Sequence, residues 1–150
     1  MFQFVDPGRL VDGDLILELI ERDPGDPVLE FVPTYRFRMS LTHRAVEMGR
    51  IELRIGNHQR LVMYGGHIGY RVHREYRGHH YAARSVRLLL PLARHHQLGT
   101  LWITCNPDNH ASRRTCELAG LEFVEIVDLP PDIDMYARGE RQKCRYRLKL

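Results

Sequence analysis

The sequence predicts one mixed α/β domain in which strands and helices alternate through the central part. Between Gly66 and Leu121 the apolar pattern changes from the two-residue period of a strand to the longer period of a helix, and this change then recurs. The 150 residues suffice for one hydrophobic core but are few for two. A hydrophobic fraction of 43% and a charged fraction of 27% are ordinary for a soluble globular protein. We therefore expect a single domain over residues 1–150.

The first third of the chain contains short apolar runs. Leu15 to Ile20 fits a helix or a strand, because periodicity alone cannot decide so short a segment. The run is followed by the turn cluster Asp23 to Pro27. Ile51 to Ile55 alternates and precedes Gly56-Asn57, which predicts a strand and its turn. Leu61 to Tyr64 either continues this strand or begins the next one.

The next segments predict a strand, a turn and a helix. His67 to Val72 alternates, and Arg77 to Ala82 follows as a turn that opens a helix near Tyr81. Beyond the turn, apolar residues recur at three- and four-residue spacing, which predicts one apolar stripe along a helix. Pro91 lies within this pattern and is expected to kink the helix, because it removes a backbone donor.

A second strand and helix follow, and the chain ends on an alternating segment. Leu101 to Cys105 is the second strand, Asn109 fits a helix N-cap, and Gly120 fits the left-handed residue just past that helix. Cys144 to Leu150 places apolar residues on one face and basic residues on the other. This alternation predicts a half-buried antiparallel strand.

Composition limits the location and the kinds of site. No apolar run approaches the roughly 20 residues that span a bilayer, and the N-terminus lacks a signal-peptide pattern, so we expect a cytoplasmic protein without membrane contact. Three scattered cysteines indicate a reducing compartment. Nine histidines without paired thiols predict no metal site. A net charge of +3 is mildly basic, and the basic residues are spread along the chain, which argues against a nucleic-acid partner.

The order strand, loop, helix, strand, helix resembles the GCN5-related N-acetyltransferase (GNAT) superfamily. The family loop reads Gln or Arg, two residues, Gly, one residue, then Gly or Ala. Arg77 and Ala82 fill its ends, while His80 occupies the place of the usual glycine. The second family signature matches Asn109, Ser112 and Gly120. The resemblance implies a mixed, mostly antiparallel central sheet flanked by helices, and it favours a strand for the run that begins at Leu15.

The resemblance also implies the co-substrate and the reaction. The co-substrate is acetyl-coenzyme A, no metal is needed, and the acetyl group passes to a primary amine. Backbone N–H groups and a helix N-terminus suit a pyrophosphate, and the strand before the loop binds the pantetheine arm in the family. The expected cofactor-binding residues are Tyr70, Arg71, Val72, Arg77, Gly78, His79, His80, Tyr81, Ala82, Ala83, Asn109 and Ser112.

Four residues are candidates for the catalytic chemistry. Many family members use a tyrosine seven residues after the signature Asn as the acid, and Cys116 stands there; a thiol can donate a proton, although a cysteine on the inner face of a helix more often packs. Asn109 contacts the coenzyme arm or an ordered water in the family. Glu52 and His67 are the candidate bases, with Glu75 a weaker third.

Several readings remain open at this point. The altered loop and the missing tyrosine also fit a non-catalytic acyl-coenzyme A-binding module of the same fold. The many arginines and interleaved aromatics fit a small basic nucleic-acid-binding domain, although less well. A cysteine–histidine nucleophile at Cys105 or Cys116 lacks an adjacent activating pattern. The acceptor is a small amine or a protein N-terminus, and the sequence does not distinguish a monomer from a homodimer.

Overall fold

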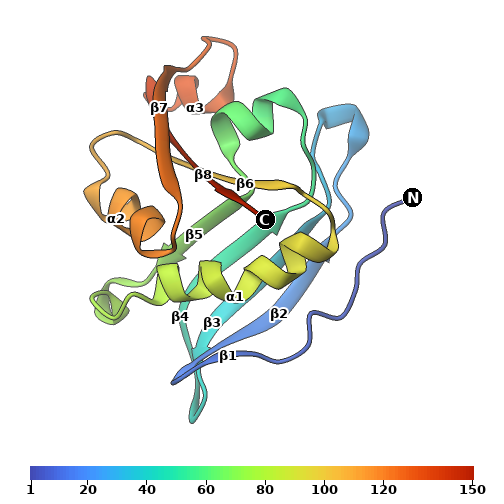
Figure 1. Cartoon of the computed structure of the whole chain (residues 1–150), viewed down its shortest axis with the longest axis vertical. Helices are drawn as coiled ribbons and strands as arrows, with labels where there is room; N and C mark the ends of the chain where they lie inside the picture. Colours follow the sequence, from blue (N-terminus) through green and yellow to red (C-terminus); the bar gives the residue numbers. More distant parts are fainter.

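The structure, a computed structural model that describes residues 1–150, contains two antiparallel β-sheets (Figure 1). Five strands form the first sheet in the order β1-β2-β3-β4-β5, and three form the second in the order β6-β8-β7. The predicted mixed α/β class is confirmed, with the sheet divided in two. The strands are β1 Leu10–Asp12, β2 Leu15–Asp23, β3 Thr34–Leu41, β4 Arg44–Arg54, β5 Ile68–Val72, β6 Thr100–Cys105, β7 Glu122–Asp128 and β8 Gln142–Lys149.

Three α-helices and three short turns of helix connect the strands. No helix combines the length and the apolar composition that crossing a bilayer requires. In Figure 1, η1, η2 and α3 all lie toward one end of the molecule, opposite the β3–β4 hairpin. The helices are α1 Tyr81–His95, α2 His110–Leu118 and α3 Asp134–Ala137, and the short turns are η1 Pro27–Leu29, η2 Leu61–Gly65 and η3 Arg74–Tyr76.

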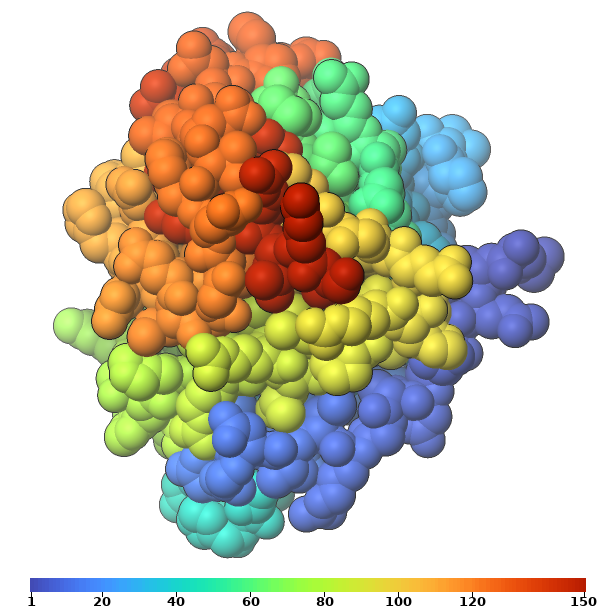
Figure 2. Space-filling view, viewed as in Figure 1, coloured from blue at the N-terminus to red at the C-terminus, as the bar shows by residue number.

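Helix α1 covers one face of the five-stranded sheet. Its predicted apolar stripe is confirmed, because Val86, Leu89 and Ala93 are fully buried against the sheet. The helix continues through Pro91 to His95. The proline side chain is exposed, and the residue lacks the N–H that would donate to the carbonyl of Arg87. In Figure 2, α1 and the segment that contains α2 and β7 form much of the visible surface.

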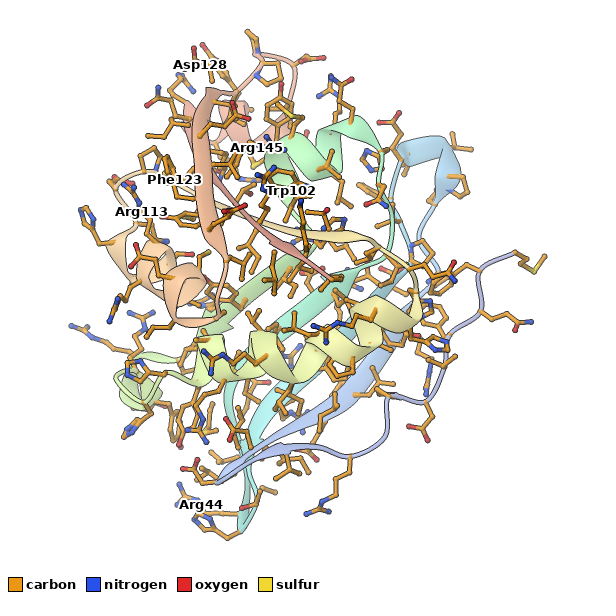
Figure 3. The ribbon with its side chains drawn as sticks, viewed as in Figure 1. Arg44, Trp102, Arg113, Phe123, Asp128 and Arg145 are labelled. Atoms are coloured by element: carbon orange, nitrogen blue, oxygen red, sulfur yellow. The ribbon has the colours of Figure 1, made fainter.

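Strand β8 is antiparallel and half-buried as predicted, with Lys149 exposed and Arg147 partly exposed, but it buries Arg145 on its basic face. It is the middle strand of its sheet, and Lys143 and Arg145 are only 7% and 5% exposed. The guanidinium of Arg145 lies 4.0 Å from the ring centroid of Trp102 and donates to the Val62 carbonyl (Figure 3). The neighbouring turn η2 thus covers part of the face that alternation alone assigns to solvent.

Three of the short apolar runs can now be assigned. Leu15 to Ile20 is a strand, as the family pattern favoured, and Ile51 to Arg54 lies within β4. The strand expectation for Leu61 to Tyr64 is wrong, because this segment is the π-helical turn η2. The turn closes through a hydrogen bond of 2.6 Å from the Gly66 N–H to the Leu61 carbonyl.

The two sheets touch at the start of β5 and then separate. The His67 N–H donates to the Trp102 carbonyl at 2.7 Å, and the Trp102 N–H donates to His67 Nδ1 at 2.9 Å. Beyond this point β5 pairs only with β4, and β6 pairs only with β8. The separation leaves the free edge of β5 facing the gap between the sheets.

Candidate active site

A cleft of about 1340 Å³ opens where the sheets separate. We call one part the helix end; it is lined by β5, by residues 76–78 and 80–82, and by the start of α2. The other part, the strand end, is lined by the β2–β3 loop, β3, β4, η2 and α3. The cleft therefore combines a helix N-terminus at one end with charged strand side chains at the other.

Strand β5 turns unpaired main-chain groups toward the helix end. The Arg54 N–H donates to the His67 carbonyl and the His73 N–H donates to the Met48 carbonyl, at 2.7 and 2.8 Å. Because hydrogen-bonding direction alternates along an antiparallel strand, residues 69 and 71 also face β4. The N–H and C=O of Tyr70 consequently point away from β4, where no strand pairs with them.

The loop before α1 provides a run of free backbone donors. The N–H groups of residues 78–83 donate to no other group of the chain, and those of Tyr81 to Ala83 form the first turn of α1. Gly78 and His80 both have positive φ, at 93° and 60°. Consecutive amides in such a turn, next to the positive end of a helix, form a concave anion site.

A pair of hydroxyl groups lies in the cleft between β5 and α2. Tyr70 Oη and Ser112 Oγ are 2.5 Å apart, and both residues line the cleft. Asn109 caps α2 as predicted, because its side chain accepts from the Ser112 N–H at 3.1 Å. Burial raises the pKa of Tyr70, so the phenol stays protonated at neutral pH.

Comparison with known proteins assigns the family. Residues 26–122, well over half of the chain, match the family model described as an acetyltransferase (GNAT) domain. The chain belongs to the GNAT acetyltransferase family. The matched model describes acetyltransferases, a class of acyltransferases. No curated protein matches its sequence.

Solved structures of GNAT proteins share the fold at low sequence identity. A protein of Vibrio cholerae described as a ribosomal-protein-serine acetyltransferase has a TM-score of 0.68 at 15% identity, over 97% of this chain and 100% of that one. The microcin C7 self-immunity acetyltransferase MccE, in complex with acetyl-CoA and AMP, has a TM-score of 0.61 at 13% identity, over 78% and 61%. The ribosomal-protein-S5-alanine acetyltransferase of Vibrio fischeri has a TM-score of 0.61 at 15%, over 77% and 61%. This chain therefore spans less than two thirds of the length of MccE and of the Vibrio fischeri protein.

Within this GNAT fold, most of the predicted site residues line the cleft. The structure brings Glu52 to the strand end. At the helix end it places Tyr70, Arg71, Val72, Arg77, Gly78, His80, Tyr81, Ala82, Asn109 and Ser112. Two predicted cofactor-binding residues do not line it: His79 is exposed beside the Tyr81 ring, and Ala83 is buried in the core.

Cys116 does not reach the cleft, which contradicts its proposed role as the acid. Its side chain is fully buried in the core near Cys105 and Cys144, and burial raises the pKa of its thiol. All three cysteines are free thiols. The helix turns the seventh position after Asn109 inward, so the packing interpretation of Cys116 is the correct one.

His67 is also separated from the cleft, which contradicts its role as a base. The ring is fully buried, with Nε2 at 2.9 Å from Asn57 Oδ1 and 3.0 Å from the Gly56 carbonyl. Nδ1 accepts from the Trp102 N–H, so neither nitrogen is free, and burial lowers the pKa to about 4. Glu75 is exposed on η3 outside the cleft, which leaves Glu52 as the candidate base.

Sequence reasoning missed several cleft residues at both ends. Arg36 and Arg54 lie beside Glu52, and Arg114 from α2 lines the helix end. The alternation of β3 and β4 gives the face on which Arg36 and Arg54 lie. It does not show that this face borders a cleft. Arg114 lies on the exposed side of α2, and nothing in the neighbouring sequence indicates that this side borders a cleft.

Proposed function

We propose that the chain transfers an acetyl group from acetyl-coenzyme A to a primary amine by direct attack. The observation that carries this proposal is the set of unused main-chain donors at the helix end, on Tyr70 and on residues 78–83. An extended acyl carrier that ends in a pyrophosphate is the ligand that such a strand edge and anion site suit. Acetyl-coenzyme A supplies an activated thioester there.

Each part of the helix end has a distinct task in this proposal. The edge of β5 at Tyr70 binds the pantetheine arm, and the N–H groups from Gly78 to Ala82 bind the pyrophosphate. Arg77 and Arg114, both exposed and both at the cleft, add positive charge beside these amides. Guanidinium groups match phosphate geometry, so they favour a nucleotide-like ligand with several negative charges.

The reaction needs a base, a donor to the carbonyl oxygen and an acid. Glu52 accepts the proton that the amine releases, and the Tyr70 N–H donates to the thioester oxygen as negative charge develops on it. A bond forms between the amine nitrogen and the acetyl carbon while the carbon–sulfur bond breaks. Ser112 Oγ donates a proton to the departing sulfur and takes one from Tyr70 Oη, which lies 2.5 Å away. Glu52 releases the amine's proton to solvent, and water in the cleft returns a proton to the phenol, so that both groups regain their starting state.

Calorimetric titration with acetyl-coenzyme A, coenzyme A and ATP tests the ligand. We expect micromolar dissociation constants for acetyl-coenzyme A and coenzyme A, and no detectable binding of ATP. Release of free thiol in the presence of primary amines then tests the transfer. Binding without release on any amine would support the non-catalytic module instead, and absence of binding would contradict the proposal.

A further inference from the structure

The strand end contains a carboxylate and a guanidinium on the same face of β4. Glu52 and Arg54 are two residues apart, so their side chains leave the strand on the same side. Their side chains are 29% and 28% exposed, and both residues line the cleft. A ligand at the strand end therefore meets both charges.

Hydrogen bonds hold the guanidinium of Arg54 in place but leave one of its nitrogens without a partner. Its Nη1 donates to the carbonyls of Gly65 and Gly66 at 2.9 and 3.0 Å, and its Nε lies 3.4 Å from Glu52 Oε2. Nη2 has no hydrogen-bond partner in the chain, and it lies over Gly69, where a Cβ would be 2.6 Å from it. The lack of a side chain at residue 69 permits this position, next to the strand that borders both ends of the cleft.

Only one carboxylate oxygen of Glu52 accepts a hydrogen bond within the chain. Its Oε2 faces two guanidinium groups, at 3.4 Å from Arg54 Nε and 3.8 Å from Arg36 Nη2. Arg36 is held in turn by Asp23 at 2.7 Å and Glu21 at 3.0 Å. Oε1 of Glu52 accepts no hydrogen bond within the chain. The pair thus leaves one anionic acceptor and one cationic donor free.

We propose that the acceptor is an amine that also carries a carboxylate. The amine binds at Glu52 Oε1, and the carboxylate binds at Arg54 Nη2. A simple cationic amine would meet two arginines beside the base, whereas an attached carboxylate makes a charge-assisted hydrogen bond with one of them. The two side chains meet, with Arg54 Nε at 3.4 Å from Glu52 Oε2, so a short chain between the amine and the carboxylate can span the two free atoms. This inference rests on the proposed acetyl transfer and names its acceptor class.

Matched acids and amides test the inference. The panel contains glycine, β-alanine, γ-aminobutyrate and δ-aminovalerate with their amides, and the tripeptides Glu-Ala-Ala and Gln-Ala-Ala. Thiol release gives kcat/KM for each acceptor. We expect at least one acid to exceed its amide by about tenfold or more, because only the acid brings a negative charge to the cationic guanidinium of Arg54.

Variants show whether Arg54 carries this preference. In Arg54→Gln the ratio of acid to amide should fall to about one, while the dissociation constant of acetyl-coenzyme A stays within about twofold. Arg54→Lys should restore part of the ratio. Gly69→Ala retains the charge but displaces Nη2, so it should also lower the ratio. Arg50→Gln removes a charge from the same face of β4 outside the cleft and should leave the ratio unchanged.

Three outcomes overturn the inference. They are equal use of acids and amides by the unaltered protein, acetylation of no panel acid by protein that binds acetyl-coenzyme A, and an undiminished ratio in Arg54→Gln. Failure to bind acetyl-coenzyme A at all is a different result and contradicts the proposed function. Thermal unfolding of each variant verifies that the fold is retained.

Discussion

The two ends of the cleft offer ligands different kinds of groups. At the helix end the free donors are main-chain N–H groups of Tyr70 and residues 78–83. At the strand end the free groups belong to side chains, Glu52 and Arg54. Main-chain recognition tolerates changes of side chain as long as the backbone keeps its course. Side-chain recognition changes with a single residue, so the strand end is where specificity for the acceptor can arise.

The largest expected loss of acetyl-coenzyme A affinity follows from placing a negative charge among the free N–H groups of the helix end. Ala82→Asp should weaken acetyl-coenzyme A binding by about a thousandfold, because a unit charge about 4 Å from the pyrophosphate costs about 4 kcal/mol. An acidic residue in the first turn of α1 favours the helix itself, so the fold should persist. Calorimetry measures the affinity, and unchanged affinity would contradict the placement of the pyrophosphate.

The contact between the sheets, which creates both ends, should weaken in acid. Burial holds the pKa of His67 near 4, below its ordinary 6.5, so between these values the unfolded chain binds a proton that the folded chain does not. The contribution of His67 to the free energy of unfolding should be fully present above about pH 6.5. As the pH falls toward 4, the free energy of unfolding should decrease by about 3 kcal/mol. Urea unfolding at several pH values measures this loss. His67→Gln should lose less between these pH values, whereas the exposed His43→Gln should match the unaltered protein.

Two residues of α2, one in the cleft and one in the core, test which side chain acts as the acid. Ser112→Ala should lower kcat by about a hundredfold, because it removes the proton donor, and leave acetyl-coenzyme A affinity nearly unchanged. Cys116→Ala is the matched control on α2: kcat should be retained, and stability should fall by about 1 kcal/mol because a buried side chain becomes smaller. Loss of kcat in Cys116→Ala alone would reverse the assignment.

The smallest expected effect concerns the side chain of His80, at the usual glycine position. His80 has φ of 60°, a left-handed conformation that costs a side-chain-bearing residue about 1 kcal/mol. His80→Gly should therefore stabilise the fold by about 0.5 to 1 kcal/mol and change acetyl-coenzyme A affinity by less than about twofold. A tenfold loss of affinity would show that the imidazole, and not the main chain, binds the phosphate.

The elements around the cleft could be predicted because their signals are local. The alternation of His67 to Val72 and the period of the helix after Tyr81 each lie within one short window, and Asn109 caps its helix three residues from its partner N–H. The order of these elements was sufficient for the family resemblance, and that resemblance identified most residues of the helix end.

The missed features depend on contacts between distant segments. The Tyr70–Ser112 pair joins residues 42 apart in the sequence, and Arg145 is buried because η2 and Trp102 cover it. The sequence of Leu61 to Tyr64 wrongly predicts a strand, because four apolar residues fit either period. His67 and Cys116 have the right chemistry for catalysis, but only packing shows that neither faces the cleft.

Amide hydrogen exchange by NMR, without and with saturating acetyl-coenzyme A, tests main-chain recognition most directly. The account predicts slower exchange of the N–H groups of Tyr70 and residues 78–82 on binding. The amide of Arg54, which already donates to the His67 carbonyl in the sheet, should not change. Protection confined to the strand end, or no protection at residue 70 and in the loop, would contradict it.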